Sequence, residues 1–524
     1  MKVTKTDFIL YRECPNNVWV KLHQPKEYSK FEISEFEKAL GEMGNDVEEL
    51  ARVMFPEGKM VNGRGEEAQK YTQKLIAEKT KVIFQAVFIT DKFLVATDVL
   101  KWNESADAYD LYEIKMSSTS DEDDEEDGKP KKVSKKKELQ YENDIAFQVN
   151  VLLMCNVPIR NKYLVRLNKG YVKSGPLAFA PNQLFIIEDK TKEIDNLAPS
   201  VLIEMDEASL FLSEKETPTA PCPCHYKGRS SHCTAFTYIN PSVPSYSVHD
   251  LNRIGNSKKY LKELLDAGIL TIDKVPIDDR LQPQKKKEDE EAAKPRKLNQ
   301  VMMYKSQEPI IDLEAIKAEL NSLTFPLYFL DYETFPTAIP IFDGYHPYQH
   351  IVFQYSLHVL KDKNAPLEHF ELLLLHGDPA ERIVKSLRSH IGDTGSIISW
   401  YKKFENSRNR ELASLVPLQF EFLHSVIDRT YDLMDIVDNQ YYVHPGFKGS
   451  ASIKKVQTVL APDLSYKKLS VQNGTDAIEA YRQITAGELT GELAEEKKRQ
   501  MLEYCEYDTK VMYMIWKFFT KLAE

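Results

Sequence analysis

The sequence predicts an α/β protein of about three domains. Its length of 524 residues exceeds what one hydrophobic core usually supports. Apolar segments of strand character and longer helical segments occur in both halves, and 42% of the residues are hydrophobic, so large cores can form. A charged, polar stretch at residues 282–297 is typical of a linker. We therefore expect domains at residues 1–240 and 316–524, joined by a helical connector and this linker at residues 241–315.

Composition restricts the partners and the compartment. The net charge of -11 argues against a generally basic coat for nucleic acid, although a local basic groove around acidic metal sites is compatible with it. There is no apolar run of 18 residues, and the N-terminal segment lacks the features of a signal peptide, so we expect a cytoplasmic protein without a membrane partner. Six cysteines are too few for a disulfide scaffold, so clustering among them indicates metal binding.

The N-terminal half is predicted to place acids beside a lysine. Glu113 and Lys115 share one face of a strand, and hairpin geometry brings Asp98 of the preceding strand towards them. A Glu-x-Lys pair is also common on solvated strand faces, which is the alternative interpretation. The strands are predicted at residues 81–89, 92–102, 108–118 and 161–172.

Helices are predicted on either side of these strands. The first 60 residues are mainly helical, and a helix over residues 39–55 carries Glu48. A second helix over residues 144–155 carries Asp144 and Gln148. Between strand and helix, residues 118–138 hold seven consecutive acids followed by a run of lysines, which predicts solvated disorder, with a specific flexible arm as the alternative.

Three cysteines cluster at Cys222, Cys224 and Cys233, with two histidines between them, and Cys14 lies far upstream. Four thiolates suit an iron-sulfur cluster, whereas tetrahedral Zn²⁺ also accepts a histidine in place of one cysteine. Residues 247–276 are predicted to form two short helices around an Ile-Gly-Asn turn, which serves either as a phosphate-binding unit or as a plain connector.

The C-terminal domain begins with a buried strand at Leu327–Thr334, which projects Asp331 and Glu333 from one face. Neighbouring carboxylates repel unless a cation lies between them, and Mg²⁺ or Mn²⁺ prefers such oxygen ligands. A strand end with its acids in solvent is the alternative. Strands at residues 348–360 and 369–377 and a helix at residues 379–391 are expected to follow.

Further acids follow in the C-terminal domain. A strand at residues 396–404 is predicted to deliver Glu405. Asp432 or Asp435 lies on the next segment, and either is a candidate ligand or a capping residue. Tyr504 and Asp508 stand four residues apart, so they share one face of a helix.

The N-terminal motif resembles the RecB-like branch of the PD-(D/E)xK nucleases. The resemblance implies that Asp98 and Glu113 hold a metal ion and that Lys115 holds or activates the attacking water. It further implies that Glu48, in a Gly-x-x-x-Glu motif, is a metal ligand, that Gln148 supports the site, and that the four cysteines hold a [4Fe-4S] cluster, with Zn²⁺ as the alternative. Two positions depart from the pattern, since Gln85 stands where an acid is expected and Leu152 where a tyrosine often follows the glutamine.

The C-terminal motifs resemble the DEDD exonucleases, whose fold is a ribonuclease-H-like three-layer α/β domain. The resemblance implies that Asp331, Glu333 and Asp508 hold two Mg²⁺ or Mn²⁺ ions and that Tyr504 orients the attacking water. In these enzymes the second acidic motif usually ends in Phe-Asp. Here Glu405 takes the place of that aspartate, and its side chain is one methylene longer.

The whole chain resembles a bacterial family known as domain of unknown function 2779, including the GSxSIKxV element in residues 449–456. The two nuclease resemblances imply a metal-dependent nuclease with two active sites, acting on single-stranded DNA or DNA ends in repair, recombination or defence. The alternatives are a nucleic-acid-binding scaffold with one inactive site and an RNA-processing exonuclease. The chain lacks a P-loop motif, so ATP-driven unwinding requires a helicase or defence-system partner.

Overall fold

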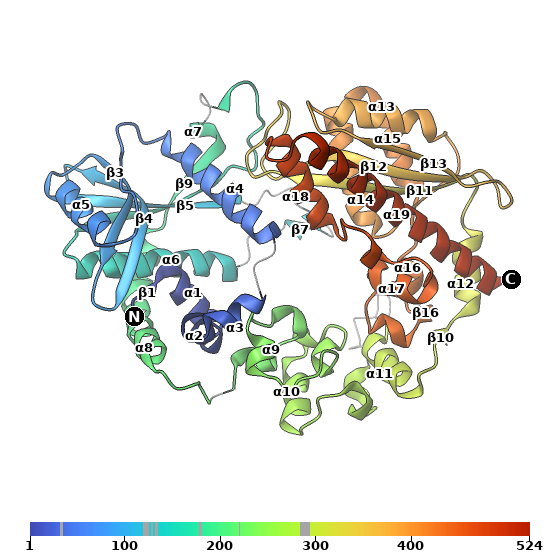
Figure 1. Ribbon diagram of the computed structural model, residues 1–524, viewed down its shortest axis with the longest axis horizontal. Helices are drawn as coiled ribbons and strands as arrows, with labels where there is room; N and C mark the ends of the chain where they lie inside the picture. The colour runs from blue at the N-terminus through green and yellow to red at the C-terminus, as the bar shows by residue number, and fades with distance from the viewer. Residues whose placement is uncertain are drawn as a thin grey trace. The chain divides into compact units, whose positions relative to one another are not determined.

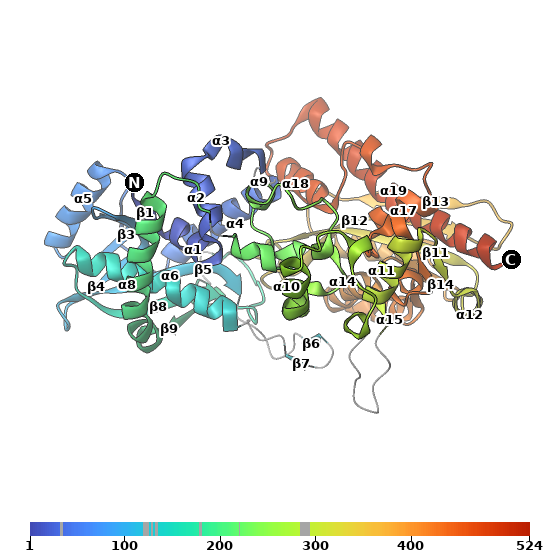
Figure 2. The ribbon, with the colours of Figure 1, turned by 90° about the horizontal axis from the view of Figure 1, so that it is seen from below.

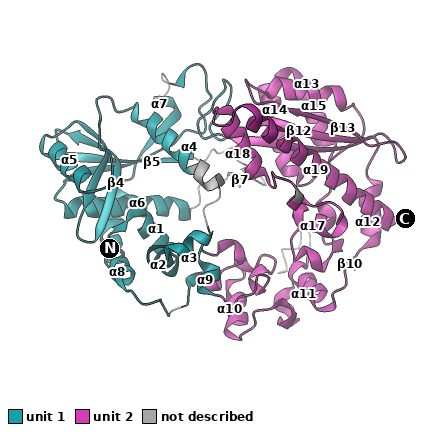
Figure 3. Ribbon diagram, in the orientation of Figure 1, with its two compact units in different colours: residues 1–223, 233–240, 337–349 teal, residues 224–232, 241–336, 350–524 magenta. Residues whose placement is uncertain are grey.

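The chain is a mixed α/β protein with several sheets, as the sequence predicts. Its computed structural model describes residues 1–31, 35–118, 125–126, 129–130, 135–177, 181–219, 221–282 and 294–524. The internal contacts group these residues into two compact units (Figure 3). Unit 1 comprises residues 1–223, 233–240 and 337–349, and unit 2 comprises residues 224–232, 241–336 and 350–524.

Unit 1 is built on a seven-stranded sheet with the order β2-β3-β4-β5-β8-β9, in which β1 also pairs with β4. The predicted hairpin forms, because Val99 of β4 pairs with Tyr112 of β5 in antiparallel register. The strands are β1 (Val3–Thr4), β2 (Lys59–Met60), β3 (Val82–Ile89), β4 (Phe93–Asn103), β5 (Ala108–Ser118), β8 (Ile159–Leu167) and β9 (Phe185–Asp189).

Helices cover both faces of this sheet. The helix α4 packs through Val47 and Ala51 on one face, and α6 packs on the other through Ile145 and Phe147, where it also contacts α8 (Figures 1 and 2). The predicted helices at residues 39–55 and 144–155 correspond to α4 and α6. The helices are α1 (Lys5–Glu13), α2 (Pro15–His23), α3 (Pro25–Tyr28), α4 (Glu35–Arg52), α5 (Glu66–Ala77), α6 (Lys135–Met154), α7 (Pro181–Leu184), α8 (Thr191–Ser213) and α9 (Phe236–Ile239).

The acidic and basic insertion predicted at residues 118–138 lies largely outside the described residues. Within it, β6 (Glu125–Glu126) pairs antiparallel with β7 (Lys129–Pro130). The helix α6 begins at Lys135, near the end of this insertion.

Residues 337–349 belong to unit 1, although the chain on both sides of them belongs to unit 2. The Tyr348 hydroxyl donates to the carbonyl oxygen of Met116, and the backbone amide of Lys173 donates to the carbonyl oxygen of Tyr345 at 2.9 Å. The Ala338 side chain is buried in the apolar cluster beneath α4. This segment therefore completes the packing of unit 1 from a distant part of the sequence.

Unit 2 is built on a five-stranded sheet with the order β13-β12-β11-β14-β15. The first three strands are antiparallel neighbours, whereas β14 and β15 run parallel to β11. The strands are β11 (Leu327–Pro336), β12 (His350–Leu360), β13 (Glu368–Leu373), β14 (Ser396–Ser399) and β15 (Thr430–Asp432), and a separate pair joins β10 (Ile310–Ile311) to β16 (Tyr442–Val443).

Helices lie on both faces of this sheet as well, which makes three layers (Figure 1). The longest helix, α19, packs on the face that carries Phe329, and α13 and α15 pack on the face that carries Leu330. The helices are α10 (Lys258–Asp266), α11 (Arg296–Ser306), α12 (Leu313–Asn321), α13 (Ala380–His390), α14 (Lys402–Leu415), α15 (Phe420–Asp428), α16 (Asp435–Asp438), α17 (Ile453–Leu460), α18 (Gly474–Thr485) and α19 (Gly491–Ala523).

The strand predicted at residues 396–404 is shorter in the structure. It ends at Ser399, and Tyr401 adopts the left-handed conformation with φ 73° before α14 begins. The Asp432 carboxylate accepts the backbone amides of Tyr401 and Lys402 at 2.8 Å each, which satisfies donors at the start of the helix. Glu405 is therefore delivered by the first turn of a helix and not by a strand.

The region predicted as two short helices, residues 247–276, holds one α-helix, α10, preceded by 3₁₀ turns at Val248–Asp250 and Ile254–Asn256. The predicted linker lies outside the described residues from 283 to 293, and its last two residues already belong to α11. Within the described part of the chain, no helix combines the length and the apolarity needed to cross a membrane.

Candidate metal centres

The paired acids of unit 2 owe their placement to the alternation of β11. Phe329, Asp331 and Glu333 point to the face covered by α19, whereas Tyr332 points to the other face, where its hydroxyl donates to Asn409 at 2.9 Å. Asp331 pairs with Ser356 of β12 in the middle of the sheet. The two carboxylates and the Cys505 thiol offer atoms within 4.8 Å of one another. The acids are thus held together inside the fold and not at a solvated strand end.

Two further acids influence this pair electrostatically. Glu405 and Asp508 are 4% and 7% exposed, and burial is the largest cause that raises the pKa of each. The Asp331 and Glu333 carboxylates raise the pKa of Glu405 further, and Asp508 raises the pKa of Asp331 beyond the effect of burial. The four acids singled out in the sequence therefore act on one another, and we call them the unit 2 carboxylate site: Asp331, Glu333, Glu405 and Asp508.

Two tyrosine hydroxyls act on Asp508. Burial raises the pKa of Asp508 to about 6, and hydrogen bonds from Tyr466 and Tyr504 limit the rise. Tyr504 lies where the sequence predicts it, one helical turn before Asp508 on α19. Tyr466 was not predicted, because it comes from a 3₁₀ turn that is distant in sequence from the other site residues.

The Lys454 side chain brings a positive charge to the unit 2 carboxylate site. The Lys454 ammonium lies 5.5 Å from the ring centroid of Tyr466 and 5.8 Å from that of Tyr504, and it lowers the pKa of Glu333 against the larger effects of burial and neighbouring acids. Its Nζ atom donates to the Gln472 carbonyl oxygen at 2.7 Å. Lys454 lies in the GSxSIKxV element, which the sequence singled out without assigning a role to this lysine.

The candidates Asp432 and Asp435 have different surroundings. Asp432 accepts backbone amides at the start of α14 and a third from Met434 at 3.2 Å, so it has the contacts of a capping residue. Burial raises the pKa of Asp435 to about 6, followed by the effect of Asp432. Neither residue is among those that shift the pKa values of Asp331 or Glu333.

Unit 1 also gathers acids, on adjacent strands. Asp98 and Glu113 flank the paired residues of β4 and β5, and the backbone amide of Ile114 donates to the Asp98 carboxylate at 2.8 Å. Burial, followed by the Glu113 charge, raises the pKa of Asp98 to about 8. Glu113 is 1% exposed, yet Lys115 and Lys5 outweigh burial and hold its pKa well below the usual range.

Two lysines balance the acids of unit 1. The Lys115 and Lys5 ammonium groups each lie 2.7 Å from the same Glu113 oxygen, and Lys115 also pairs with Asp144. Gln148 donates to the other Glu113 oxygen at 2.7 Å. Lys115 and Gln148 were predicted, whereas Lys5 was not, because a lysine near the N-terminus carries no pattern that indicates a site. We call this set the unit 1 carboxylate site: Asp98, Glu113, Lys115, Asp144, Gln148 and Lys5.

Gln85, which stands where the resemblance expects an acid, contacts two carboxylates of unit 1. It adopts φ 54° in the middle of β3, a conformation rarely taken by a residue with a side chain. Its amide nitrogen donates to Glu48 and lies 3.4 Å from an Asp98 oxygen, where a further acid would add repulsion. Glu48 also pairs with Arg52 at 2.5 Å. Leu152, the second departure, is buried in the apolar cluster around α6.

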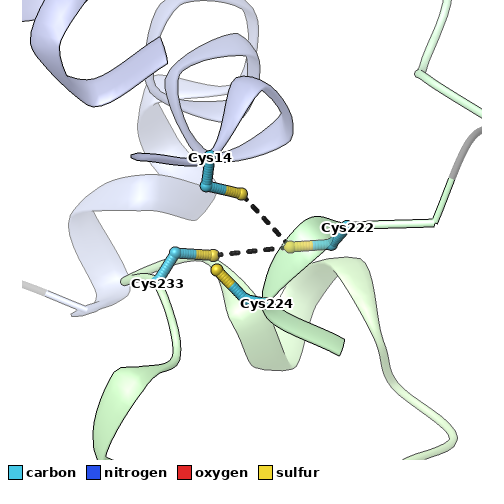
Figure 4. Close-up of side chains that lie close together, drawn as sticks. All are labelled: Cys14, Cys222, Cys224 and Cys233. Atoms are coloured by element: carbon cyan, nitrogen blue, oxygen red, sulfur yellow. Dashed lines mark hydrogen bonds between the residues drawn. The ribbon is translucent and has the colours of Figure 1, made fainter. Parts of the chain in front are cut away.

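The predicted cysteine cluster is present. The thiols of Cys14, Cys222, Cys224 and Cys233 offer atoms within 4.8 Å of one another (Figure 4). The Sγ atom of Cys222 lies 3.2 Å from that of Cys14 and 3.8 Å from that of Cys233. Cys222 is fully buried, and Cys14 is 1% exposed. A set of four thiols gathered from distant segments can hold a metal centre.

Comparison with known proteins gives a family match but no activity. This chain is 26% identical to the uncharacterized protein MG366 of Mycoplasma genitalium over 222 residues, which cover 39% of this chain and 33% of that protein. It is 27% identical to the MG366 homolog of Mycoplasma pneumoniae over 212 residues, which cover 36% of this chain and 31% of that protein. The matches therefore span about a third of the length of each relative.

The family match lies mostly in unit 2 and also covers residues 337–349 of unit 1. It includes Asp331, Glu333 and Glu405 but ends before Lys454 and Asp508. The predicted resemblance is thereby confirmed for this segment alone, since residues 328–452 match the model of a domain of unknown function, DUF2779.

Proposed function

We propose that this protein is a metal-dependent nuclease whose principal site is the unit 2 carboxylate site. The observation that carries the proposal is the convergence of four buried or half-buried carboxylates from β11, α14 and α19, which act on one another electrostatically. Their order along the chain and the antiparallel meander that precedes two parallel strands are consistent with the predicted ribonuclease-H-like exonuclease. The aspartate on a long C-terminal helix, one turn after a tyrosine, supports the tyrosine-type DEDD subgroup.

The donor set fits Mg²⁺ or Mn²⁺. Asp331, Glu333 and Asp508 provide hard oxygen ligands, and Glu405 holds one buried oxygen without a hydrogen-bond partner among the described residues. Buried acids that raise one another's pKa bind a divalent cation in place of protons. The bound ions supply electrostatic stabilisation to the attacking and leaving oxygens of a phosphoryl displacement.

Other residues of the chain have separate roles. The Tyr504 hydroxyl, which hydrogen-bonds Asp508, would orient a water molecule there, and Tyr466 would hold the Asp508 carboxylate in place. Lys454 provides a positive charge that attracts a phosphate group to an otherwise acidic site. Glu405 adds a fourth carboxylate, one methylene longer than the aspartate of the resembling enzymes.

The unit 1 carboxylate site is proposed as a second nuclease site of the PD-(D/E)xK type. Asp98 and Glu113 would hold Mg²⁺ or Mn²⁺, with Glu48 as a further ligand, and Lys115 would position the attacking water. One observation favours the alternative that this site is inactive and only binds nucleic acid. Lys5 already pairs with Glu113, so the acids are better neutralised here than in unit 2 and have less need of a cation.

The cysteine cluster is proposed to hold a structural metal centre. A single tetrahedral ion with metal-sulfur bonds of about 2.3 Å separates its sulfurs by about 3.8 Å. The observed separations of 3.2 Å and 3.8 Å are close to that edge length. A [4Fe-4S] cluster, in which each thiolate binds a different iron, needs a wider cage, so Zn²⁺ fits this spacing better and the iron-sulfur cluster is the alternative.

The proposed substrate is DNA, as single strands or exposed ends, in repair, recombination or defence, with RNA as the alternative. The test is cleavage of end-labelled single-stranded DNA, duplex DNA and RNA with Mn²⁺, Mg²⁺ or EDTA. Asp508→Asn should slow stepwise degradation by about a hundredfold or more, because it removes a metal ligand. Asp393→Asn is the matched control, since that carboxylate is exposed and pairs with Arg388. Equal rates for wild type and Asp508→Asn would refute the assignment.

A further inference from the structure

A second polar cluster lies under α19, on the same sheet face as the unit 2 carboxylate site. His358 of β12 and His369 of β13 are cross-strand partners whose rings stack at 4.5 Å and 28°. Glu506 of α19 completes the group, and one ligand atom from each residue lies within 4.8 Å of the other two. None of these three residues has a part in the nuclease proposed above.

One hydrogen-bond network satisfies both rings and assigns a tautomer to each. The Thr509 hydroxyl donates to the Glu506 carbonyl oxygen at 3.0 Å, so its oxygen can only accept from its other neighbours. The Ser356 hydroxyl, 2.8 Å away, must therefore donate to Thr509. Consequently His358 donates through Nδ1 to Thr509 at 2.8 Å, and His369 donates through Nε2 to Ser356 at 2.9 Å.

In this network, Nε2 of His358 and Nδ1 of His369 keep a lone pair without a hydrogen-bond partner among the residues that the structure describes. Burial lowers the pKa of both imidazoles, to about 3 for His358, which favours their neutral forms. Two neutral imidazoles whose remaining N–H groups are held by hydroxyls have the arrangement of metal-binding histidines with outer hydrogen-bond partners.

We propose that His358, His369 and Glu506 bind a divalent transition-metal ion, with Zn²⁺ as the best match. Two imidazoles and one carboxylate select zinc and similar metals, whereas Mg²⁺ prefers oxygen ligands alone. The ion joins α19 to two strands of the sheet. Because α19 also carries Asp508, the ion steadies the helix that presents this ligand of the carboxylate site.

The test measures bound zinc in the full-length protein, at buffered free Zn²⁺ and with excess Mg²⁺ present. The variant His369→Ala/Glu506→Gln changes the two partly exposed ligands and leaves the buried His358 in place. The control is His424→Ala, which removes a histidine stacked on Phe420 of α15. We expect the double variant to bind one zinc fewer per chain than wild type and the control to bind the same amount.

Co²⁺ then identifies which site has changed. The difference spectrum between wild type and the double variant should contain visible bands without thiolate charge transfer, because no cysteine is a ligand here. Equal zinc stoichiometry and affinity would overturn the proposal, and so would a difference spectrum with the thiolate signature. If the double variant folds poorly by circular dichroism, His369→Asn alone, at a partly exposed position, is measured with the same expected loss.

Discussion

Replacing Asp331 by asparagine should stabilise the metal-free protein. The Asp331 and Glu333 carboxylates approach within 4.8 Å. Two full charges at that separation repel by about 3.5 kcal/mol at an effective dielectric constant of about 20. Their raised pKa values mean that protons already relieve part of this repulsion. We therefore expect the free energy of unfolding to rise by about 1–2 kcal/mol, which corresponds to a Tm increase of about 2–8 °C.

Added Mn²⁺ should make the wild type more stable than Asp331→Asn. Mn²⁺ at about a hundred times its Kd adds about 2.7 kcal/mol to the stability of a protein that binds it only when folded. The wild type should gain this amount and Asp331→Asn much less, because the variant lacks a charged ligand. Thermal melting in EDTA and in Mn²⁺ tests the reversal, and Asp393→Asn should follow the wild type in both. Equal stabilisation of wild type and Asp331→Asn by Mn²⁺ would show that the pair does not hold the metal.

Three further outcomes are expected. Because burial raises the pKa of Asp508 to about 6, the native state still holds a proton at pH values where the unfolded chain, with a pKa near 4, has released it. In EDTA, the stability of wild type relative to Asp508→Asn should therefore fall as the pH rises from about 4 to 6, and a rise would contradict the assignment. Lys115→Ala should abolish cleavage by unit 1 alone, and residual cleavage should still require Asp508, whereas loss of all cleavage would contradict two independent sites. Cys222→Ser should lower the bound metal content and the melting temperature, and Cys155→Ser, which lies outside the cluster, is the control. Colourless wild-type protein with zinc indicates a single ion, and brown protein with iron indicates an iron-sulfur cluster. Unchanged metal content in Cys222→Ser would refute the metal centre.

Local patterns were sufficient to predict much of the fold. Alternation in residues 327–334 predicts both the strand, which runs to Pro336 in the structure, and the face that carries the acids, because side chains on a strand alternate. The spacing of Tyr504 and Asp508 predicts a shared helical face in the same way. Both predictions depend only on the geometry of a strand or a helix over a few consecutive residues.

The features that the sequence did not predict depend on contacts between residues that are distant in the chain. Lys5 reaches Glu113, and Tyr466 reaches Asp508, only after the sheets and helices have assembled. The early end of β14 has the same origin, because the carboxylate that accepts the first amides of α14 comes from Asp432 on another strand. A single sequence offers no local signal for such partners.

The grouping of residues 337–349 with unit 1 limits how the molecule can be divided. A fragment ending near residue 240 would lack Ala338 and Tyr348, and would leave part of the apolar surface beneath α4 in water. A fragment beginning near residue 300 would carry the same segment without its binding surface. A single cut in the chain therefore cannot separate unit 1 from unit 2, and the two carboxylate sites are best separated by point substitutions.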